Sequence, residues 1–155
     1  MQEAFSVTLD WQNGYEFLVD FEQEGVPPLR TDEGPPLGAG SGPTPTRLLA
    51  AAVGNCMSAS LRYCLGHAKI NLLDLKTHVE GTIVRNEQGR LRVGSLTVHL
   101  EPMVAPEDRD RVAECIEGFE DFCTVGQSVR QGIDLEVEVT PGSRVVAAQS
   151  DAAGG

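Results

Sequence analysis

The sequence has few positive charges and few aromatic residues. It carries 12 lysine and arginine residues against 23 aspartate and glutamate residues, a formal net charge of −11. Such a chain repels the phosphates of nucleic acids and anionic membrane surfaces, so we expect neither as a partner. Aromatic residues make up 5% of the chain and hydrophobic residues 41%, which predicts a globular protein with a core of aliphatic side chains.

Targeting, membrane-spanning and metal-binding patterns are not evident either. The segment 1–5 has no basic start and no apolar core follows it, so we expect no secretory signal. We find no stretch that approaches the ~20 apolar residues of a transmembrane helix, and we expect a cytoplasmic protein. There is no Cys-x-x-Cys motif, and His67, His78 and His99 do not fall at helical ligand intervals. We therefore expect no metal and no cofactor.

The length of 155 residues suits a single domain, which we place at residues 1–145, followed by a disordered tail at 146–155. Residues 5–11 and 15–21 alternate apolar and polar side chains around Asn13-Gly14, which predicts a β-hairpin. Residues 25–42 are rich in glycine and proline and predict a long irregular loop. Loops of this length in a compact domain are often functional.

A long helix is predicted after this loop. Thr44 suits the N-cap and Pro45 the first helical position, and the helix should run to about Gly66. Small residues around Cys56 allow another segment to approach closely. Apolar and small residues recur at three- and four-residue steps and predict one buried face, formed by Leu48, Leu49, Ala52, Val53, Cys56, Ala59, Ser60, Tyr63 and Cys64.

The second half of the chain predicts two strands, two helices and a closing strand. The strands cover 72–85 and 90–101, one helix begins at Pro106, a short helix covers 125–131, and the strictly alternating segment 133–139 is the last strand. The first of these helices should bury Val112, Cys115, Ile116 and Phe119. The order β-β-α-β-β-α-α-β is typical of an α+β fold.

Four cysteines in a cytoplasmic chain are more often catalytic, metal-bound or buried than joined in structural disulfides. Cys64 and Cys115 lie on apolar helix faces, and we interpret both as packing residues. Cys56 is either a small buried hydrophobe or a functional thiol. Cys123 marks a break between two amphipathic stretches, and a thiol at a helix start is biased toward thiolate. If the fold brings Cys56 and Cys123 together, the chain carries a redox dithiol.

Two polar or glycine-rich features of the long loop do not predict a binding site. Asp32 and Glu33 are expected in a solvated turn. The run Gly38–Gly42 resembles a phosphate-binding loop only loosely, because it lacks the Lys-Ser/Thr ending, so we do not expect nucleotide binding.

Two segments and the element order resemble the OsmC/Ohr family of osmotically inducible and organic-hydroperoxide-resistance proteins. The first segment is 32–56, in which Pro45 precedes Cys56 by eleven positions, and the second is 123–128. The resemblance implies an intertwined homodimer with its sites at the interface. It also implies a thiol peroxidase in which an organic hydroperoxide oxidises Cys56 to a sulfenic acid, and Cys123 condenses with it to a disulfide. A dithiol reductant, either a lipoyl protein or thioredoxin, would restore both thiols.

One feature of the family is missing. Relatives with peroxidase activity carry a glutamate one or two positions after the proline, and this acid holds an arginine against the reactive sulfur. Here those positions are Thr46 and Arg47. Arg30 and Arg47 are the candidates for stabilising the thiolate. The missing acid favours one alternative, a homodimer that binds a small lipophilic ligand while its cysteines are inert. A redox sensor whose disulfide alters a partner surface is a further alternative.

Overall fold

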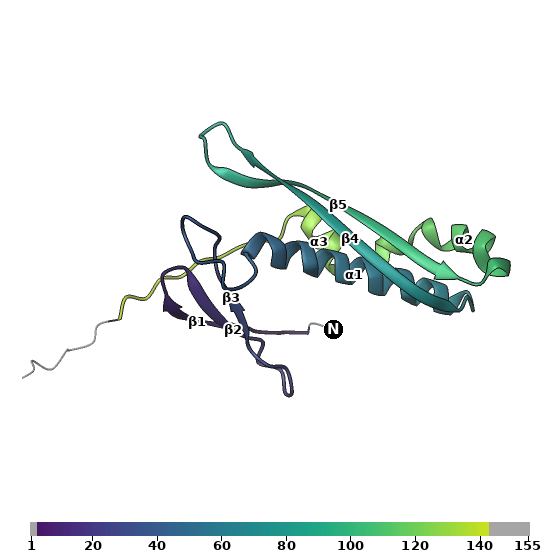
Figure 1. Ribbon diagram of the computed structural model, residues 1–155, viewed down its shortest axis with the longest axis horizontal. Coiled ribbons are helices and arrows are strands. Elements are labelled where there is room, and N and C mark those ends of the chain that lie inside the picture. Colours follow the sequence, from purple (N-terminus) through teal and green to yellow (C-terminus); the bar gives the residue numbers. More distant parts are fainter. Residues whose placement is uncertain (1–2, 143–155) are drawn as a thin grey trace, which may run out of the picture.

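The computed structural model describes residues 3–142, and the tail predicted at 146–155 lies outside the described residues. The α+β class with antiparallel sheets is confirmed (Figure 1). The elements are β1 (Thr8–Asn13), β2 (Glu16–Asp20), β3 (Leu29–Thr31), α1 (Pro45–His67), β4 (Leu72–Arg85), β5 (Leu91–Val104), the 3-10 helix η1 (Pro106–Arg111), α2 (Val112–Ile116), the 3-10 helix η2 (Phe119–Phe122) and α3 (Thr124–Gln131).

The N-terminal strands form a small antiparallel sheet in the order β1-β2-β3. The predicted hairpin around Asn13-Gly14 is confirmed, and Gly14 adopts a positive φ of 52°, as a tight turn requires. β3 lies inside the segment predicted to be an irregular loop. Its Arg30 pairs with Leu18 of β2, so these backbone groups complete the sheet.

β4 and β5 form a second antiparallel sheet, a long hairpin of 14 residues in each strand. The hairpin crosses one face of α1, and its tip extends past the start of that helix (Figure 1). A Cβ added to Gly54 of α1 would lie 2.7 Å from Cγ2 of Val79, so the glycine allows β4 to pack closely against the helix.

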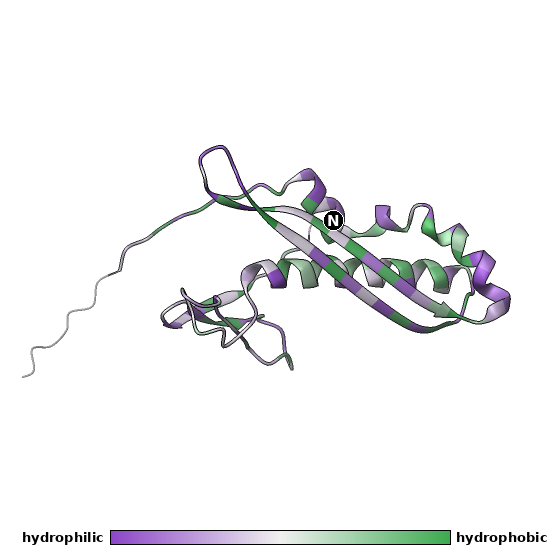
Figure 2. Ribbon diagram, turned by 45° about the horizontal axis from the view of Figure 1, so that its top comes forward, coloured by the Kyte–Doolittle hydropathy of each residue, from purple (hydrophilic) through white to green (hydrophobic). Residues whose placement is uncertain are grey.

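The core lies around α1, which packs between the β4–β5 hairpin and the segment that contains α2, η2 and α3. Hydrophobic residues follow α1 along its length and alternate with polar residues along β4 and β5 (Figure 2). The predicted buried face was wrong in part, since Ala52 and Ala59 are exposed and Tyr63 is 61% exposed. The helix is covered from two sides, and steps of four residues bring other side chains inward. The buried hydrophobic residues of the core are Val53, Met57, Leu61, Leu65, Ile70, Cys115, Phe119 and Cys123.

α1 is also long and apolar enough, by length and composition alone, to cross a membrane. The expectation that no such stretch exists was therefore wrong. Among the described residues it is the one helix that meets this test. A core helix passes the same test, and α1 contributes Leu61 and Leu65, 2% and 0% exposed, to the core.

Two predicted elements differ from the structure. The helix expected from Pro106 is broken into η1, α2 and η2, because Gly118 adopts a positive φ of 99° and turns the chain. Cys115 and Phe119 are buried as predicted, but Ile116 is 59% exposed. The alternating segment 133–139 forms no strand, because none of the described strands pairs with its backbone. Its four apolar residues are 69–85% exposed.

Candidate functional site

α1 and α3 bring two cysteines into contact. Cys56 lies midway along α1 and is half-buried, whereas Cys123 is fully buried immediately before α3. The two thiols lie close enough for each to shift the pKa of the other. Positions 67 residues apart in the sequence therefore form one local dithiol, which is the arrangement that a redox pair requires.

The start of α3 points its backbone amides at both sulfur atoms. The N–H of Val125 donates a hydrogen bond of 3.4 Å to Sγ of Cys56, and the N–H of Gly126 donates one of 3.2 Å to Sγ of Cys123. Cys123 is the N-cap residue of α3, and its extended backbone aims its side chain back into the first turn. The first amides of a helix have no partner within the helix, so they are free to bind an anionic sulfur.

The pKa of Cys56 is lowered. Burial by itself would raise it, but the combined hydrogen bonds from the N–H of Val125, the thiol of Cys123 and the amides of Gly126 and Thr124 outweigh burial. All of these donors stabilise the thiolate more than the thiol. Cys56 is therefore the more acidic partner of the dithiol.

The pKa of Cys123 is raised. Burial is the main cause, followed by the hydrogen bond and the charge of Cys56, while the amide of Gly126 and the hydroxyl of Ser60 act in the opposite direction. The bias toward thiolate that was expected for a cysteine at a helix start is outweighed at Cys123 by its complete burial. The amides at that helix start lower the pKa of Cys56 instead.

Within residues 3–142, no group of three or more His, Cys, Asp or Glu side chains is arranged to hold a metal ion. The chemistry that the described residues offer at this site is that of the two sulfur atoms.

The family described as OsmC-like protein matches residues 38–138, a span that includes both cysteines. The chain belongs to the OsmC-like family. No curated protein sequence matches it.

Solved structures share the OsmC-like fold at low sequence identity. An OsmC-like protein of unknown function from Vibrio cholerae is 12% identical with a TM-score of 0.71, and the match covers 82% of this chain and 94% of that chain. An OsmC-like protein from Mycoplasma pneumoniae is 17% identical with a TM-score of 0.70, covering 84% and 89%. The organic hydroperoxide resistance protein OhrB of Bacillus subtilis is 21% identical with a TM-score of 0.59, covering 89% and 98%.

The two arginines proposed for this OsmC-like site lie apart from the sulfur of Cys56. Arg30 forms an ion pair with Glu16 of the neighbouring strand β2, and its side chain is 52% exposed. Arg47 is exposed in the first turn of α1, next to Thr46, whose hydroxyl is 3.0 Å from that of Thr44. Among the described residues, the groups that set the pKa of Cys56 are backbone amides and the Cys123 thiol, and neither arginine is one of them.

Asp32 was wrongly expected in a solvated turn. It is 3% exposed, and its carboxylate accepts hydrogen bonds from the N–H groups of Glu33, Ala39 and Ser41 and from the Ser41 hydroxyl. These bonds, led by the amide of Ser41, outweigh burial and lower the pKa of Asp32. The carboxylate therefore organises the loop that leads into α1. Its contacts span nine residues, and composition alone gave no signal for them.

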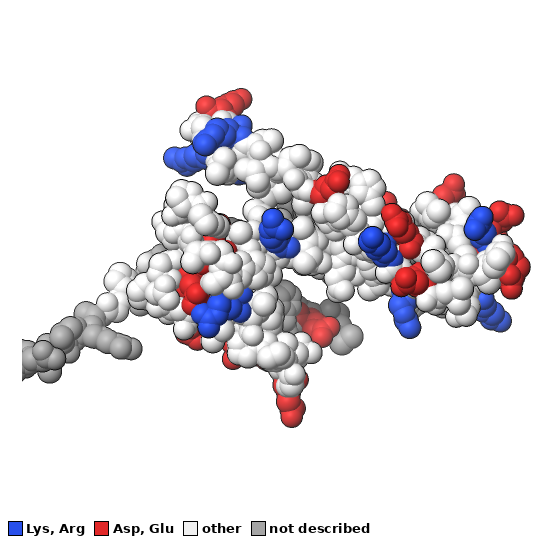
Figure 3. All heavy atoms as spheres, in the orientation of Figure 1, with Lys and Arg blue, Asp and Glu red and all other residues white. Residues whose placement is uncertain are grey.

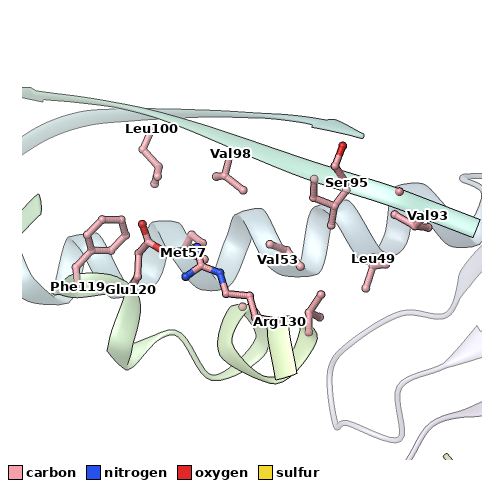
Figure 4. Close-up of a pocket in the computed structure, with 14 residues that line it drawn as sticks. Leu49, Val53, Met57, Val93, Ser95, Val98, Leu100, Phe119, Glu120 and Arg130 are labelled. Carbon is pink, nitrogen blue, oxygen red and sulfur yellow. Dashed lines mark hydrogen bonds and ion pairs between the residues drawn. The ribbon is translucent and has the colours of Figure 1, made fainter. Parts of the chain in front are cut away.

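A cavity of about 400 Å³ lies between α1, β5 and α3 (Figure 4). Its walls are largely aliphatic and include Leu49, Val53 and Met57 of α1. Arg130 of α3 forms an ion pair with Glu120 beside the cavity. Neither Cys56 nor Cys123 lines the cavity. Two residues that do line it lie beside these cysteines: Met57 follows Cys56 in the sequence, and Gly126 lies next to the sulfur of Cys123.

Proposed function

We propose that this protein is a thiol-dependent peroxidase that reduces organic hydroperoxides, with Cys56 as the attacking thiol and Cys123 as the resolving thiol. The observation that carries the proposal is the opposite direction of the two pKa shifts in one contacting pair. A lowered pKa at Cys56 increases its share of reactive thiolate, whereas the raised pKa of Cys123 favours the protonated thiol. Family membership supports the same chemistry, since OhrB of Bacillus subtilis is an organic hydroperoxide resistance protein.

The reaction needs only the two sulfurs, a hydroperoxide and a dithiol. The Cys56 thiolate attacks the terminal oxygen of ROOH, the O–O bond breaks, and ROH leaves after taking up a proton. Cys56 is then a sulfenic acid. The Cys123 sulfur attacks it, a Cys56–Cys123 disulfide forms, and water leaves. A dithiol such as a lipoyl protein or thioredoxin returns both thiols in two exchange steps and becomes a disulfide itself.

The amides of α3 take the part that an arginine was expected to play. A thiolate at Cys56 accepts hydrogen bonds from the start of this helix, where the helix dipole also favours negative charge. This arrangement supports peroxidase chemistry even though Thr46 and Arg47 replace the family's acid. Arg30 and Arg47 remain candidates for stabilisation only if a second subunit carries one of them to the sulfur.

The direct test is to count free thiols before and after one equivalent of cumene hydroperoxide, followed by peptide mapping. We expect two of the four thiols to disappear and a Cys56–Cys123 cross-link to form. Trypsin leaves Cys115 and Cys123 on one peptide, because no lysine or arginine lies between Arg111 and Arg130. A second digestion after glutamate separates the two cysteines at Glu117 and Glu120. Survival of all four thiols would contradict the proposal.

The cavity favours a second candidate, an OsmC-like protein that binds a small lipophilic ligand. An aliphatic cavity of about 400 Å³ with an ion pair beside it fits an apolar tail with a polar end. In this case cumene hydroperoxide would leave Cys56 reduced, while a fluorescent fatty acid would bind with saturation and Val53→Trp would block it. A peroxidase that also uses the cavity for its substrate tail would both lose the Cys56 thiol to cumene hydroperoxide and bind the fatty acid.

We include a homodimer in the proposal. The apolar side chains of residues 133–139 are 69–85% exposed, and those at the tip of the β4–β5 hairpin, Ile83, Val84 and Leu91, are 45–58% exposed. Positively charged side chains gather at the same hairpin tip together with an acidic one (Figure 3), and the arginines of this segment are Arg85, Arg90 and Arg92. A second copy of the chain would cover these apolar residues, and pairing with it would give segment 133–139 the strand partner that its alternation predicts.

We expect light scattering to give the mass of two chains. Leu135→Asp should shift the mass toward one chain, because a charge on the covered face of the strand would lose its solvation. Glu136→Gln, on the opposite face of the same alternating segment, is the matched control and should keep the mass of two chains. A wild-type mass of one chain would contradict this part of the proposal.

A proline at position 124 tests the role of the α3 amides. Thr124 is the first residue of α3, and Cys123 before it has φ −80° and ψ 95°, outside the α region that a following proline disfavours. Thr124→Pro therefore removes one N–H from the set that stabilises the Cys56 thiolate while the helix is kept. We expect the pKa of Cys56 to rise, so its alkylation by iodoacetamide should require higher pH.

Thr124→Ala is the matched control, because alanine keeps the amide. Its pH profile for alkylation of Cys56, followed on the tryptic peptide 48–62, should coincide with that of the wild type. Coincidence of all three profiles would show that the amide of residue 124 does not stabilise the thiolate.

A further inference from the structure

The two cysteines outside the proposed active site also meet. Cys64 lies on α1 and Cys115 on α2, and both belong to the hydrophobic core or pack against it. The thiol of Cys64 donates a hydrogen bond of 3.9 Å to the carbonyl oxygen of Cys115, and it lies close enough to the Cys115 thiol to raise the pKa of that thiol. Both cysteines were expected to be packing residues, each on its own helix, because nothing in the pattern of either helix shows that they face each other.

The contact between Cys64 and Cys115 has the same arrangement as the contact between Cys56 and Cys123, one step further along α1. Cys64 follows Cys56 by eight positions, and Cys115 precedes Cys123 by eight positions. The segment 112–123 thus runs antiparallel to α1 and places two thiol pairs along the same interface. Eight residues of helix span about 12 Å, so a sulfur of one pair cannot reach a sulfur of the other.

The two pairs differ in their surroundings. Cys56 faces the amides of α3, whereas no amide of the described chain donates to the sulfur of Cys64 or Cys115. Burial, followed by the thiol and the charge of Cys64 and by the charge of Glu114, raises the pKa of Cys115 to about 11, and the charge of Arg111 opposes this only in part. Cys115 is 2% exposed and Cys64 is half-buried. Cys64 is therefore the sulfur that a reagent from solution can reach.

We propose that Cys64 and Cys115 form a second dithiol site, which low-molecular-weight disulfides such as glutathione disulfide convert into an intrachain disulfide. The proposal does not depend on the peroxidase activity. It assigns to this site a class of oxidant that differs from the hydroperoxides proposed for Cys56.

The chemistry balances in two exchange steps. The thiolate of Cys64 attacks one sulfur of RS–SR, a Cys64–SR bond forms, and RS⁻ leaves and takes up the proton that Cys64 lost. Cys115 then attacks the Cys64 sulfur as its own proton is transferred to the second RS⁻, and the Cys64–Cys115 bond forms. Two protein thiols are oxidised, and one RS–SR is reduced to two RSH. The half-exposed thiol acts first and the buried thiol, already in contact with it, acts second.

The bond would join a short helix covalently to α1. α2 has five residues and lies between two 3-10 helices, and one further tie to the end of α1 is the hydrogen bond of 2.6 Å from Arg111 to the carbonyl oxygen of Ala68. A disulfide across positions 64 and 115 closes a loop of about 50 residues, and closing a loop of that size stabilises a fold by restricting the unfolded chain. Oxidation should therefore raise the thermal midpoint.

The experiment uses the full-length double variant Cys56→Ser/Cys123→Ser, in which only the second pair can react. After incubation with millimolar glutathione disulfide, we expect loss of both remaining thiols, loss of two hydrogen atoms from the intact mass, and a higher thermal midpoint. Mapping should recover a peptide that joins Cys64 to Cys115. Cys64→Ser added to this background should leave Cys115 reduced, because the reachable sulfur is gone.

Three results would overturn the proposal: two unreacted thiols, a stable glutathione adduct at Cys64, or a cross-link between two chains. Because the double variant could misfold, the same peptide mapping is also carried out on the wild-type protein. There, one equivalent of cumene hydroperoxide should give the Cys56–Cys123 bond alone, and glutathione disulfide added afterwards should give the Cys64–Cys115 bond. Failure at the first step contradicts the proposed peroxidase, and failure at the second step contradicts only the second dithiol site.

Discussion

Replacing Cys56 with serine should abolish the consumption of cumene hydroperoxide, with a fall on the order of 10³-fold or more in the second-order rate constant. A serine hydroxyl is far less acidic and less nucleophilic than a thiol, and the amides of Val125, Gly126 and Thr124 that lower the pKa of Cys56 cannot make up that difference. The measurement is the disappearance of peroxide under a steady supply of dithiothreitol.

Cys123→Ser should behave differently, because the first step does not need the resolving sulfur. Peroxide should oxidise one thiol of this variant per chain, and a dimedone adduct should identify the sulfenic acid at Cys56. Cys64→Ser is the control for the loss of a cysteine outside the pair and should keep the wild-type rate. A Cys56→Ser variant that still turns over, or dimedone labelling at any other cysteine, would contradict the assignment of roles.

The roles proposed for Cys56 and Cys123 depend on the packing of α3 against α1, and the sequence predicts only some of the elements involved. The hairpin at Asn13-Gly14, the start of α1 at Pro45 and the bounds of β4 follow from local turn, capping and alternation rules, so they were predicted correctly. The segment 133–139 carries an equally clear alternation but remains unpaired, because a strand needs an edge beside it as well as a pattern.

The lowered pKa of Cys56 could not be predicted from the sequence, because it also depends on how segments pack together. The groups that lower the pKa of Cys56 are main-chain amides, which every residue carries and which no residue type marks. Their direction is set by the packing of α3 against α1. A charged side chain such as that of Arg30 is visible in the sequence, so an arginine was expected to activate Cys56, but Arg30 pairs with Glu16 instead. Asp32 was misjudged likewise, since its partners are backbone groups up to nine residues away.

Gly126 is the position where one methyl group should disturb the site most. A Cβ there would lie 2.5 Å from Cε of Met57 and 2.8 Å from Sγ of Cys123. Cε ends a flexible side chain and can move away, but the Cys123 sulfur is held by the amide of residue 126 itself. Gly126→Ala should therefore push α3 away from α1 and destabilise the fold by about 1–3 kcal/mol. It should also slow Cys56–Cys123 disulfide formation by on the order of 10²-fold, as a misplacement of about 1 Å does in other sites.

The matched control is Gly66→Ala, near the end of α1, where an added Cβ meets nothing within 4 Å. Alanine is the better helix former by roughly 1 kcal/mol, so this variant should be as stable as the wild type or more stable, with unchanged disulfide formation. Chemical denaturation gives the free energies, and quenched-flow alkylation after a pulse of peroxide gives the rate. If Gly126→Ala forms the disulfide as fast as Gly66→Ala, the close packing of α3 on Met57 is not what places the resolving sulfur. If it forms the disulfide slowly while its sulfenic acid still appears at the wild-type rate, the glycine serves the second step of the reaction and leaves the first intact.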